Sequence, residues 1–333
     1  MPMPVVRFPL ALLFAWHMLG ADKPAPRIAP IYDAASIVNA ADNQSGALAA
    51  NALGTIYGAN LAYSTAAITS SDIHSGILPI VLGASETEVF VNHYAADLYY
   101  VSPAQINFLV PPNMTPGQAV VQVTIDGLAG PAVSLMLAPA APGLFQLDPH
   151  NAIATEADGT VVTPVSPAQP GDIVILYATG LGEVTPPAIY GQLPTAAAPL
   201  IAGADLSILL DGVAVDSQAI AYAGVAPGFA GLYQINLTLP ASTGSNPEIR
   251  LQIDGASSIP GVHLPVCTLL NMASICAPAS EWSRLDQQNR NKPHREMSWE
   301  PPTRSYQVDF FFDGRGYKPT PSSAATLRVL GLE

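Results

Sequence analysis

The sequence predicts an all-β protein built from two Ig-like β-sandwich domains in tandem, and three observations support this prediction. Charged residues make up only 11% of the 333 residues, against about 25% in an average soluble domain, while hydrophobic residues make up 49%. Proline, with 33 residues, is about twice as frequent as usual. Long helices are therefore excluded, because a proline inside a helix costs about 3 kcal/mol. Short strands with turn signals between them recur along the chain, as in β-sandwiches.

Alternation of apolar and polar residues marks the individual strands. It runs through residues 119–125, 234–239 and 248–254, and is typical of strands with one buried face. Residues 172–178 are apolar on both faces, which predicts a central sandwich strand. Asp-Gly pairs beginning at positions 126, 158, 211 and 254 predict tight turns, because glycine tolerates the positive φ that such turns need.

An internal repeat organises the middle of the chain. Gln105-Ile106-Asn107 is followed by a proline 6 residues after the glutamine and by Asp-Gly 21 residues after it, and Gln234-Ile235-Asn236 has spacings of 6 and 20. Upstream, residues 56–61 match residues 176–181. We therefore predict one domain over residues 30–140 and a second over residues 150–266. Proline-rich segments at 139–142 and 164–170 are expected to bracket the junction as semi-rigid connectors.

The N-terminus predicts export. Residues 1–21 combine a basic Arg7, an apolar run from Phe8 to Trp16 and small residues before Asp22, the pattern of a secretory signal peptide. A buried strand or short core helix is the alternative. The apolar run is shorter than the roughly 20 residues of a membrane-spanning helix, and no second run follows. We expect a protein that is secreted or attached to the cell surface and not integral to the membrane.

Charge divides the chain near residue 266. Arg250 is the only Lys or Arg in residues 28–266, and the whole chain has a net charge of −13, so a nucleic acid is excluded as a partner because phosphate-binding faces need clustered Lys and Arg. Residues 267–333 are richer in basic and loop-forming residues and are expected to be a weakly ordered tail. An altered reading frame in the gene is an alternative origin for this break.

Two cysteines, Cys267 and Cys276, stand near the start of this tail. They lack the second pair that a metal site would need, so a local disulfide or two free thiols is favoured.

The repeated motifs resemble one known family. Residues 100–107, Pro142-Gly143-Leu144-Phe145, residues 170–182 and residues 222–236 are similar to the hallmarks of the Solibacter-type C-terminal domain of acidobacterial secreted proteins, and the resemblance covers about residues 36–266. It implies an exported module, often attached to the ends of larger extracellular proteins, with an Ig-like fold of the IPT/TIG type and no established activity. This chain lacks a large N-terminal partner domain and continues past Val266, and the family has no agreed catalytic residues to transfer.

Catalytic and cofactor signatures are missing from the sequence. The six histidines form no His-Glu-x-x-His pair, and no Gly-x-Ser-x-Gly or phosphate-binding loop occurs. His93 is a conceivable base, although a surface or structural histidine is favoured because no partner is identifiable from spacing. Calcium is a second hypothesis, since several carboxylates lie at predicted turns, but plain turn chemistry is favoured. These carboxylates are Asp72, Asp126, Glu156, Asp158, Asp211 and Asp254. No catalytic residue, metal ligand or cofactor is expected.

Six aromatic residues gather around the repeated motifs: Tyr94, Tyr99, Tyr100, Tyr222, Phe229 and Tyr233. In one interpretation they form a platform for sugar rings or a protein partner. In the other they close the ends of the sandwiches, with Gln and Asn side chains bonding to loop backbone. Repetition of Gln-Ile-Asn in both copies favours the structural interpretation.

The function predicted from sequence is a secreted, non-catalytic binding, adhesion or spacer module. An extracellular polysaccharide or another envelope protein is the expected partner. The alternatives are an extracellular hydrolase or its carbohydrate-binding subunit, and a purely structural envelope protein.

Overall fold

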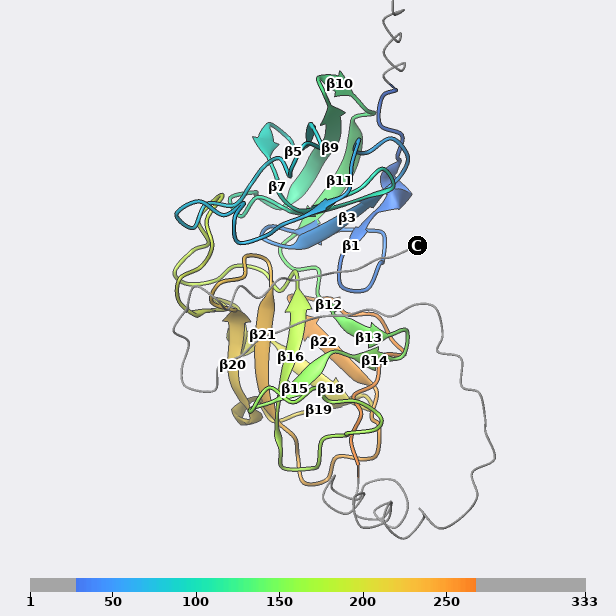
Figure 1. Cartoon of the computed structure of the whole chain (residues 1–333). Coiled ribbons are helices and arrows are strands. Elements are labelled where there is room, and N and C mark those ends of the chain that lie inside the picture. Colours follow the sequence, from blue (N-terminus) through green and yellow to red (C-terminus); the bar gives the residue numbers. More distant parts are fainter. Residues whose placement is uncertain (1–27, 268–333) are drawn as a thin grey trace, which may run out of the picture.

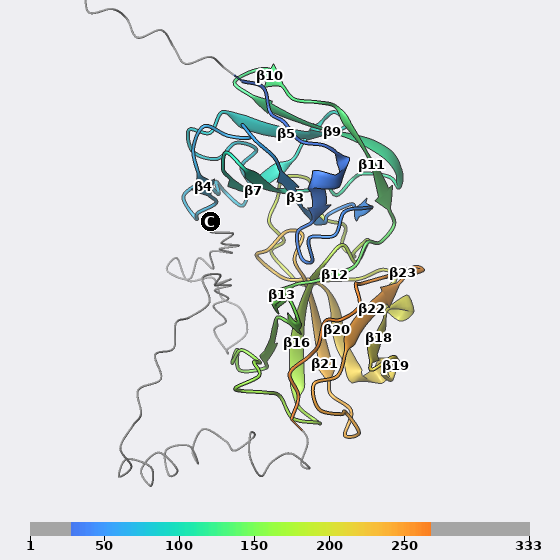
Figure 2. The same ribbon diagram turned by 90° about the vertical axis from the view of Figure 1, so that its right-hand side faces the viewer.

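The computed structural model describes residues 28–267, which form two β-sandwiches stacked end to end (Figures 1 and 2). Within this range no residue is in an α-helix, and the helical elements are three short 3₁₀ turns, η1 (Ala34–Ser36), η2 (Gly203–Asp205) and η3 (Ser217–Ala219). The all-β prediction is confirmed. The predicted signal peptide and nearly all of the predicted tail lie outside the described residues.

The first sandwich, module 1, packs two sheets face to face. One sheet has the order β1-β3-β8-β7-β4, and the other has the order β2-β11-β9-β5-β6 with β10 beside β9. The strands of the first sheet are β1 (Ile37–Asn39), β3 (Leu53–Tyr57), β4 (Ala66–Ala67), β7 (Asp97–Val101) and β8 (Gln105–Leu109). Those of the second are β2 (Leu48–Ala49), β5 (Thr87–Val91), β6 (Tyr94–Ala95), β9 (Gly117–Ile125), β10 (Leu128–Ala129) and β11 (Val133–Ala138).

The second sandwich, module 2, repeats this plan. One sheet has the order β12-β16-β21-β20-β17 with β15 beside β16, and the other has the order β19-β18-β22-β23. The first contains β12 (Gly143–Leu144), β15 (Ala154–Glu156), β16 (Ile173–Thr179), β17 (Ala198–Pro199), β20 (Ile220–Val225) and β21 (Tyr233–Thr238). The second contains β18 (Ser207–Leu210), β19 (Val213–Ala214), β22 (Ile249–Ile253) and β23 (Ala256–Ser257), and β13 (Gln146–Asp148) pairs with β14 (Asn151–Ala152).

The expected boundaries of the second domain need correction at both ends. β12 pairs with β16, so module 2 begins at residue 143 and not at 150. Cys267 is 4% exposed, and its N–H donates to the carbonyl of Ala168, so the module includes the residue assigned to the start of the tail. Short pairing segments at sandwich edges carry little periodicity, which is why the sequence pattern missed them.

The internal repeat is confirmed at the level of strand register. Tyr57 pairs with Gln105 across β3 and β8, and Tyr177 pairs with Gln234 across β16 and β21. The neighbouring strands β7 and β20 each carry a bulge, placed directly before the tyrosine that pairs with the Asn of the repeated Gln-Ile-Asn. A shared irregularity at the same register position indicates that the two modules are copies of one unit.

The predicted alternation of strand faces is confirmed, and so are three of the four predicted Asp-Gly turns. Asp158 lacks the positive φ of the other three, and Ile173, in the strand expected to be buried on both faces, is 48% exposed. Every second residue of β9 from Ala119 to Ile125 and of β22 from Ile249 to Ile253 is buried, and the residues between them are exposed or half-buried. Asp126, Asp211 and Asp254 have φ near 50°, each is followed by a glycine with φ between 75° and 77°, and each pair joins two hairpin strands. Positive φ at both residues is the hairpin turn that Asp-Gly favours.

Only one of the two proline-rich segments lies at the junction. Residues 139–142 connect β11 of module 1 to β12 of module 2. Residues 164–170 precede β16, and the opposite end of this strand, Thr179, contacts module 1. The loop 164–170 therefore lies about 20 Å from the junction, which is the length of the strand. The second predicted connector is therefore an internal loop of module 2.

The core of module 1 continues across the junction. Its contiguous cluster of buried residues includes six residues of module 2: Phe145, Ile153, Tyr177, Ala226, Ala230 and Leu232. A separate cluster fills the inside of module 2. Buried apolar contact of this kind joins the modules into one cooperative unit, unlike the polar contacts typical of loosely linked domains.

Gly231 sits at the tightest point of the junction. Its φ is +79°, and a Cβ at this position would lie 2.6 Å from Leu109 Cδ1 and 2.9 Å from Leu53 Cγ. Gly255 has nearly the same φ, +75°, but open space around it. Substituting alanine for each glycine therefore distinguishes two costs: both variants carry the strain of positive φ, and only the Gly231 variant adds a steric clash.

We predict that Gly231→Ala lowers the free energy of unfolding by about 1–3 kcal/mol more than Gly255→Ala, because only the first adds overpacking to the cost of positive φ. Urea unfolding of both variants measures the difference. Equal losses would show that module 2 does not press on Leu53 and Leu109.

Candidate functional site

The structure does not bring the six aromatic candidates together on one surface. Tyr99 is 7% exposed and Tyr233 is fully buried. Phe229 packs against the core of module 1. Tyr100 and Tyr222 are half-buried in separate modules. Tyr94, at 51%, is the most exposed of the six. The platform hypothesis is wrong for this set, because the sequence repeat placed the tyrosines in equivalent modules and not on a common face.

Tyr99 and Tyr233 instead bind the two modules together. The Tyr99 hydroxyl donates to the carbonyl of Ala230 at 2.9 Å, and the Tyr233 hydroxyl donates to the carbonyl of Gly182 and accepts from Asn51 Nδ2 at 3.3 Å. Burial raises the pKa of both phenols. Both rings thus have their polar ends satisfied inside the junction, as buried tyrosines require.

One further hydrogen bond crosses the same interface, and another joins module 1 to the connecting segment 139–142. The Leu53 N–H donates to Thr179 Oγ1 at 2.8 Å, and Thr179 Oγ1 donates to the carbonyl of Gly231 at 2.7 Å. Asn39 Nδ2 donates to the carbonyl of Ala141 at 3.1 Å. Hydroxyl and amide groups therefore supply the polar contacts at the buried end of β3.

The repeated Gln and Asn side chains bond to one another and not to loop backbone. Gln105 Nε2 donates to Asn107 Oδ1 at 2.9 Å, and Gln234 Nε2 donates to Asn236 Oδ1 at 2.7 Å. Tyr100 pairs with Asn107, and Tyr222 pairs with Asn236, on the neighbouring strands. The motif is thus a structural brace on the outer face of each repeated sheet, although its expected bonding partner was wrong.

Aromatic and aliphatic side chains lie where β6 and the segment around Ile77 in module 1 meet a loop of module 2, and all but the half-buried Tyr190 are exposed. The ring centroids of Tyr94 and Tyr190 lie 6.1 Å apart in an edge-to-face arrangement. Ile77 and Ile189 are 54% and 62% exposed. We call Ile77, Tyr94, Ile189 and Tyr190 the junction patch. Ile80 and Val81, which follow Ile77 closely in the chain of module 1, are also exposed.

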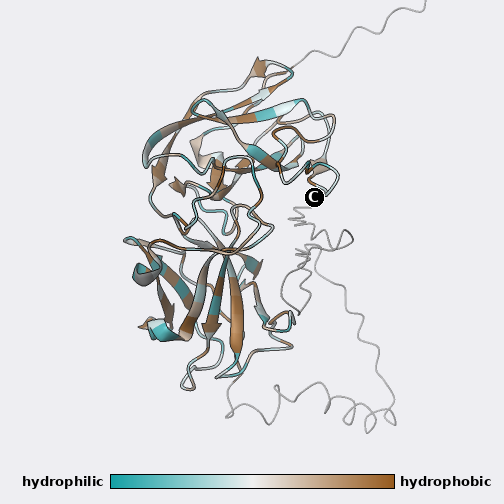
Figure 3. Cartoon of the chain, turned by 90° about the vertical axis from the view of Figure 1, so that its left-hand side faces the viewer, coloured by the Kyte–Doolittle hydropathy of each residue, from teal (hydrophilic) through white to brown (hydrophobic). Residues whose placement is uncertain are grey.

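Residues 189–193 of module 2, which we call the strap, hold this patch in place. Ile77 and Gln192 form an antiparallel bridge, the Leu78 N–H donates to the carbonyl of Gly191 at 2.9 Å, and the Leu193 N–H donates to the carbonyl of Gly76 at 2.8 Å. The Tyr190 hydroxyl donates to the carbonyl of Ala95. The strap crosses to module 1 on the left in Figure 1, and Figure 3 faces that side of the molecule.

Asp97 lies beneath the strap. It is 2% exposed, and a Cβ on Gly191 would lie 3.9 Å from its Oδ1. Among the described residues, no hydrogen-bond donor reaches its carboxylate. Burial without a partner raises its pKa to about 7, because desolvation disfavours the charged form. Sequence reasoning passed over Asp97 and Tyr190, since neither belongs to a motif.

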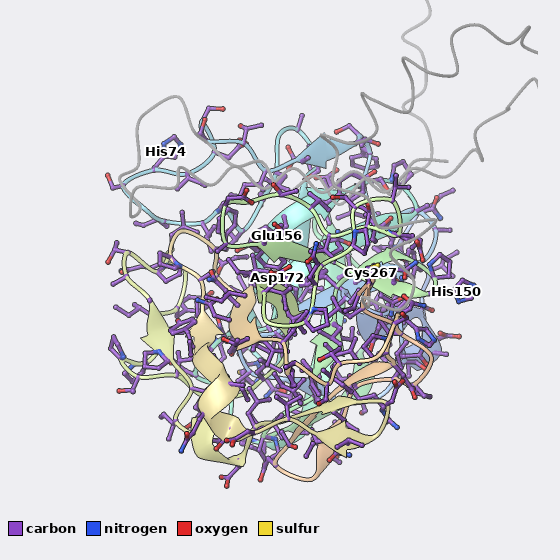
Figure 4. The ribbon with its side chains drawn as sticks, turned by 90° about the horizontal axis from the view of Figure 1, so that it is seen from below. His74, His150, Glu156, Asp172 and Cys267 are labelled. Carbon is purple, nitrogen blue, oxygen red and sulfur yellow. The ribbon has the colours of Figure 1, made fainter. Side chains whose placement is uncertain are left out.

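The carboxylates considered for calcium lie in turns, except Glu156, which ends β15 (Ala154–Glu156) beside a turn. Within residues 28–267, no three His, Cys, Asp or Glu side chains gather as a metal site would require. Burial and the charges of Asp172 and Asp158 raise the pKa of Glu156, and Glu156 and Asp172 are labelled in Figure 4. The same view places His74 and His150 at opposite edges of the molecule. His93 is exposed.

Cys267 is disulfide-bonded, which favours the disulfide over two free thiols. The other cysteine of the sequence, Cys276, lies outside the described residues.

Comparison with known proteins identifies no family. No family model matches the chain, and no curated protein matches it. The described part also contains no helix long and apolar enough to cross a membrane.

Several solved structures share similarity at a low level. One is the Bacteroides ovatus mixed-linkage glucan utilization locus protein SGBP-B, with a TM-score of 0.28, 11% identity, and coverage of 67% of this chain and 43% of that one. Another is the Prevotella bryantii surface glycan-binding protein PbSGBP-B, with a TM-score of 0.22 and 12% identity. The match covers 69% of this chain and 41% of that one. A third is the Escherichia coli adhesin FdeC, with a TM-score of 0.20 and 14% identity. The match covers 72% of this chain and 66% of that one. The chain spans less than half of either glycan-binding protein, and TM-scores this low support no inference about its ligand.

We predict that Tyr233→Phe destabilises the protein by about 1–3 kcal/mol, because Asn51 and Gly182 lose a buried partner. Tyr222→Phe is the matched control: its hydroxyl donates to Val225 three residues away, in a half-buried site within one module, and its loss costs less than about 1 kcal/mol. Thermal unfolding of the two variants compares them. Similar losses of stability in the two variants would show that the Tyr233 hydroxyl does not help to join the modules.

Proposed function

We propose that this chain is a non-catalytic binding module of the cell surface or extracellular space, and that the junction patch is its contact surface. The observation that carries the proposal is the exposed aromatic and aliphatic patch built jointly by two firmly joined modules. Export through residues 1–21 and the Solibacter-type resemblance belong to the same proposal.

The patch has the character of a recognition surface. Single exposed apolar residues are common on proteins, but a group of them marks a contact site. Here the exposed Tyr94 of β6 is in ring contact with the half-buried Tyr190 of the strap, and the exposed Ile77 pairs with the strap at Gln192. Loops held by a rigid scaffold are where binding residues concentrate, and the strap hydrogen bonds supply that rigidity.

The charge of the two modules limits the class of ligand. Residues 28–266 contain 17 Asp and Glu and one Lys or Arg, Arg250, whose guanidinium donates to the carbonyl of Ser258. A polyanion would be repelled by this surface. Tyrosine rings stack against the apolar faces of sugars and fill pockets in protein partners. The ligand is therefore an uncharged polysaccharide, with an envelope protein as the alternative outcome of the test.

The hydrolase alternative lacks support in the geometry. Asp97 is the described carboxyl with a pKa near 7, which is the value a general acid needs. Glycoside hydrolysis uses two carboxyls about 5–9.5 Å apart, and the described titratable groups coupled to Asp97 are the phenols Tyr99 and Tyr190.

We predict that the full chain is retained on insoluble neutral polysaccharide and that Tyr94→Ala weakens retention about tenfold, or about 1.4 kcal/mol, through loss of ring contact. Sedimentation with increasing amounts of polysaccharide gives the affinity. Tyr57→Ala is the matched control, because Tyr57 is also an exposed tyrosine of module 1, at 39%, but lies four residues along β3 from the junction, about 13 Å away.

Three outcomes separate the hypotheses. Retention lost in Tyr94→Ala and kept in Tyr57→Ala supports the proposal. Retention only on envelope fragments, abolished by protease treatment of the fragments, replaces the polysaccharide with a protein partner. No retention on either material overturns the binding function and leaves a spacer.

A further inference from the structure

A buried carboxyl lies where the strap is fastened to module 1 by few contacts. Asp97 begins β7 and pairs with Leu109 at the end of β8, the same end of the sheet that module 2 covers. The strap passes over it with Gly191 nearest. Lifting the strap would give the carboxyl access to water.

Three groups of contacts fasten the strap at this point. They are the two backbone hydrogen bonds of Leu78 and Leu193, the bond from Tyr190 to Ala95, and the ring contact of Tyr190 with Tyr94. Each hydrogen bond adds only modestly to the stability of the closed strap, because the same groups bond to water when the strap is open. A charge buried beneath them without a partner would oppose them with a comparable or larger free energy.

We propose that the strap is a pH-sensitive latch: it closes over protonated Asp97 and opens when Asp97 ionises. The chain thereby couples proton concentration at the cell surface to the attachment of residues 189–193 on module 1.

The surroundings of Asp97 make it the group that titrates. Among the described residues, the titratable groups that face it are Tyr99 on its own strand and Tyr190 on the strap. The charge of Asp97 contributes to raising the pKa of both phenols, so both stay neutral between pH 5 and pH 8. No described cation adjoins the carboxyl to favour its ionised form.

The direction of the pH effect follows from the two states of Asp97. In the closed state its pKa is about 7, and in the open state water returns it toward the ordinary value near 4. Between these values the closed state binds more protons than the open state, so closure weakens as pH rises. The equilibrium for opening increases by up to about tenfold per pH unit and levels off above pH 7.

Opening of the strap would also dismantle the junction patch, because Tyr190 and Ile189 lie on the strap and Tyr94 and Ile77 do not. Ligand affinity would therefore fall as the pH rises toward 7 and level off above it, and the ligand would in turn hold the strap closed. This second consequence rests on the proposed function, whereas the latch does not.

Amide hydrogen exchange in the full chain, followed by NMR from pH 5 to pH 8, tests the latch. The probes are the amides of Leu78 and Leu193, and the reference is the amide of Ser258, which donates to Leu251 within module 2. After correction for intrinsic exchange, we expect the protection of the two probes relative to the reference to fall by up to about tenfold per unit between pH 5 and pH 7. In Asp97→Asn, which cannot ionise, the ratio stays constant.

A ratio independent of pH in the unchanged protein, or the same slope in Asp97→Asn, would overturn the latch. Should Asp97→Asn fail to fold, the carboxyl ¹³C titration of Asp97 in the unchanged protein decides: a midpoint near 4 rejects the proposal, and a midpoint near 7 supports it. Polysaccharide retention measured at pH 5.5 and pH 7.5 distinguishes the two ideas. If retention does not change while the strap opens, the junction patch is not the binding surface. If the strap does not open and retention is intact, the latch is rejected and the binding function stands.

Discussion

The burial of Leu53 and Leu109 by module 2 is the contact on which the rest of this structure depends. Leu53 begins β3 and Leu109 ends β8, and the loop containing Gly231 packs so closely on them that a Cβ there would overlap both side chains. The core of module 1 is consequently completed by residues of module 2. A sandwich whose end is open to water loses apolar burial at about 25 cal/mol per Å², so the two modules stabilise each other and keep a fixed orientation.

The two copies of the repeated unit use the same positions differently. Both retain the Gln-Asn brace and the bulge before the paired tyrosine. Tyr57 in module 1 is 39% exposed, whereas its counterpart Tyr177 is fully buried with a pKa raised by burial to about 12. Tyr177 belongs to the shared core together with Phe145 and Ile153. The duplicated scaffold is therefore symmetric in its strands and asymmetric in its outer contacts.

The scarcity of cations shapes the chemistry of the junction. With Arg250 occupied by Ser258, residues 28–266 have no Lys or Arg to pair with a carboxylate at the interface. The polar contacts between the modules are made by tyrosine and threonine hydroxyls, asparagine amides and backbone groups, which remain neutral over a wide pH range. Asp97 is the exception, and its position beneath the strap is what connects protonation to the placement of Tyr190 and the junction patch.

The sequence by itself determined the strands, the turns and the duplication. Period-two alternation identified β9 and β22, Asp-Gly pairs identified three hairpins, and the spacing around Gln105 and Gln234 identified the repeat, because these features depend on neighbours within a strand or across one turn. Only the tertiary structure decided that Tyr99 and Tyr233 are buried and that Tyr94 meets Tyr190. These contacts join residues about 100 or more positions apart on separate modules, and a strand pattern specifies which face a residue occupies but not what covers that face. The candidate site was therefore beyond the reach of local sequence patterns, since it exists only where two folded modules touch.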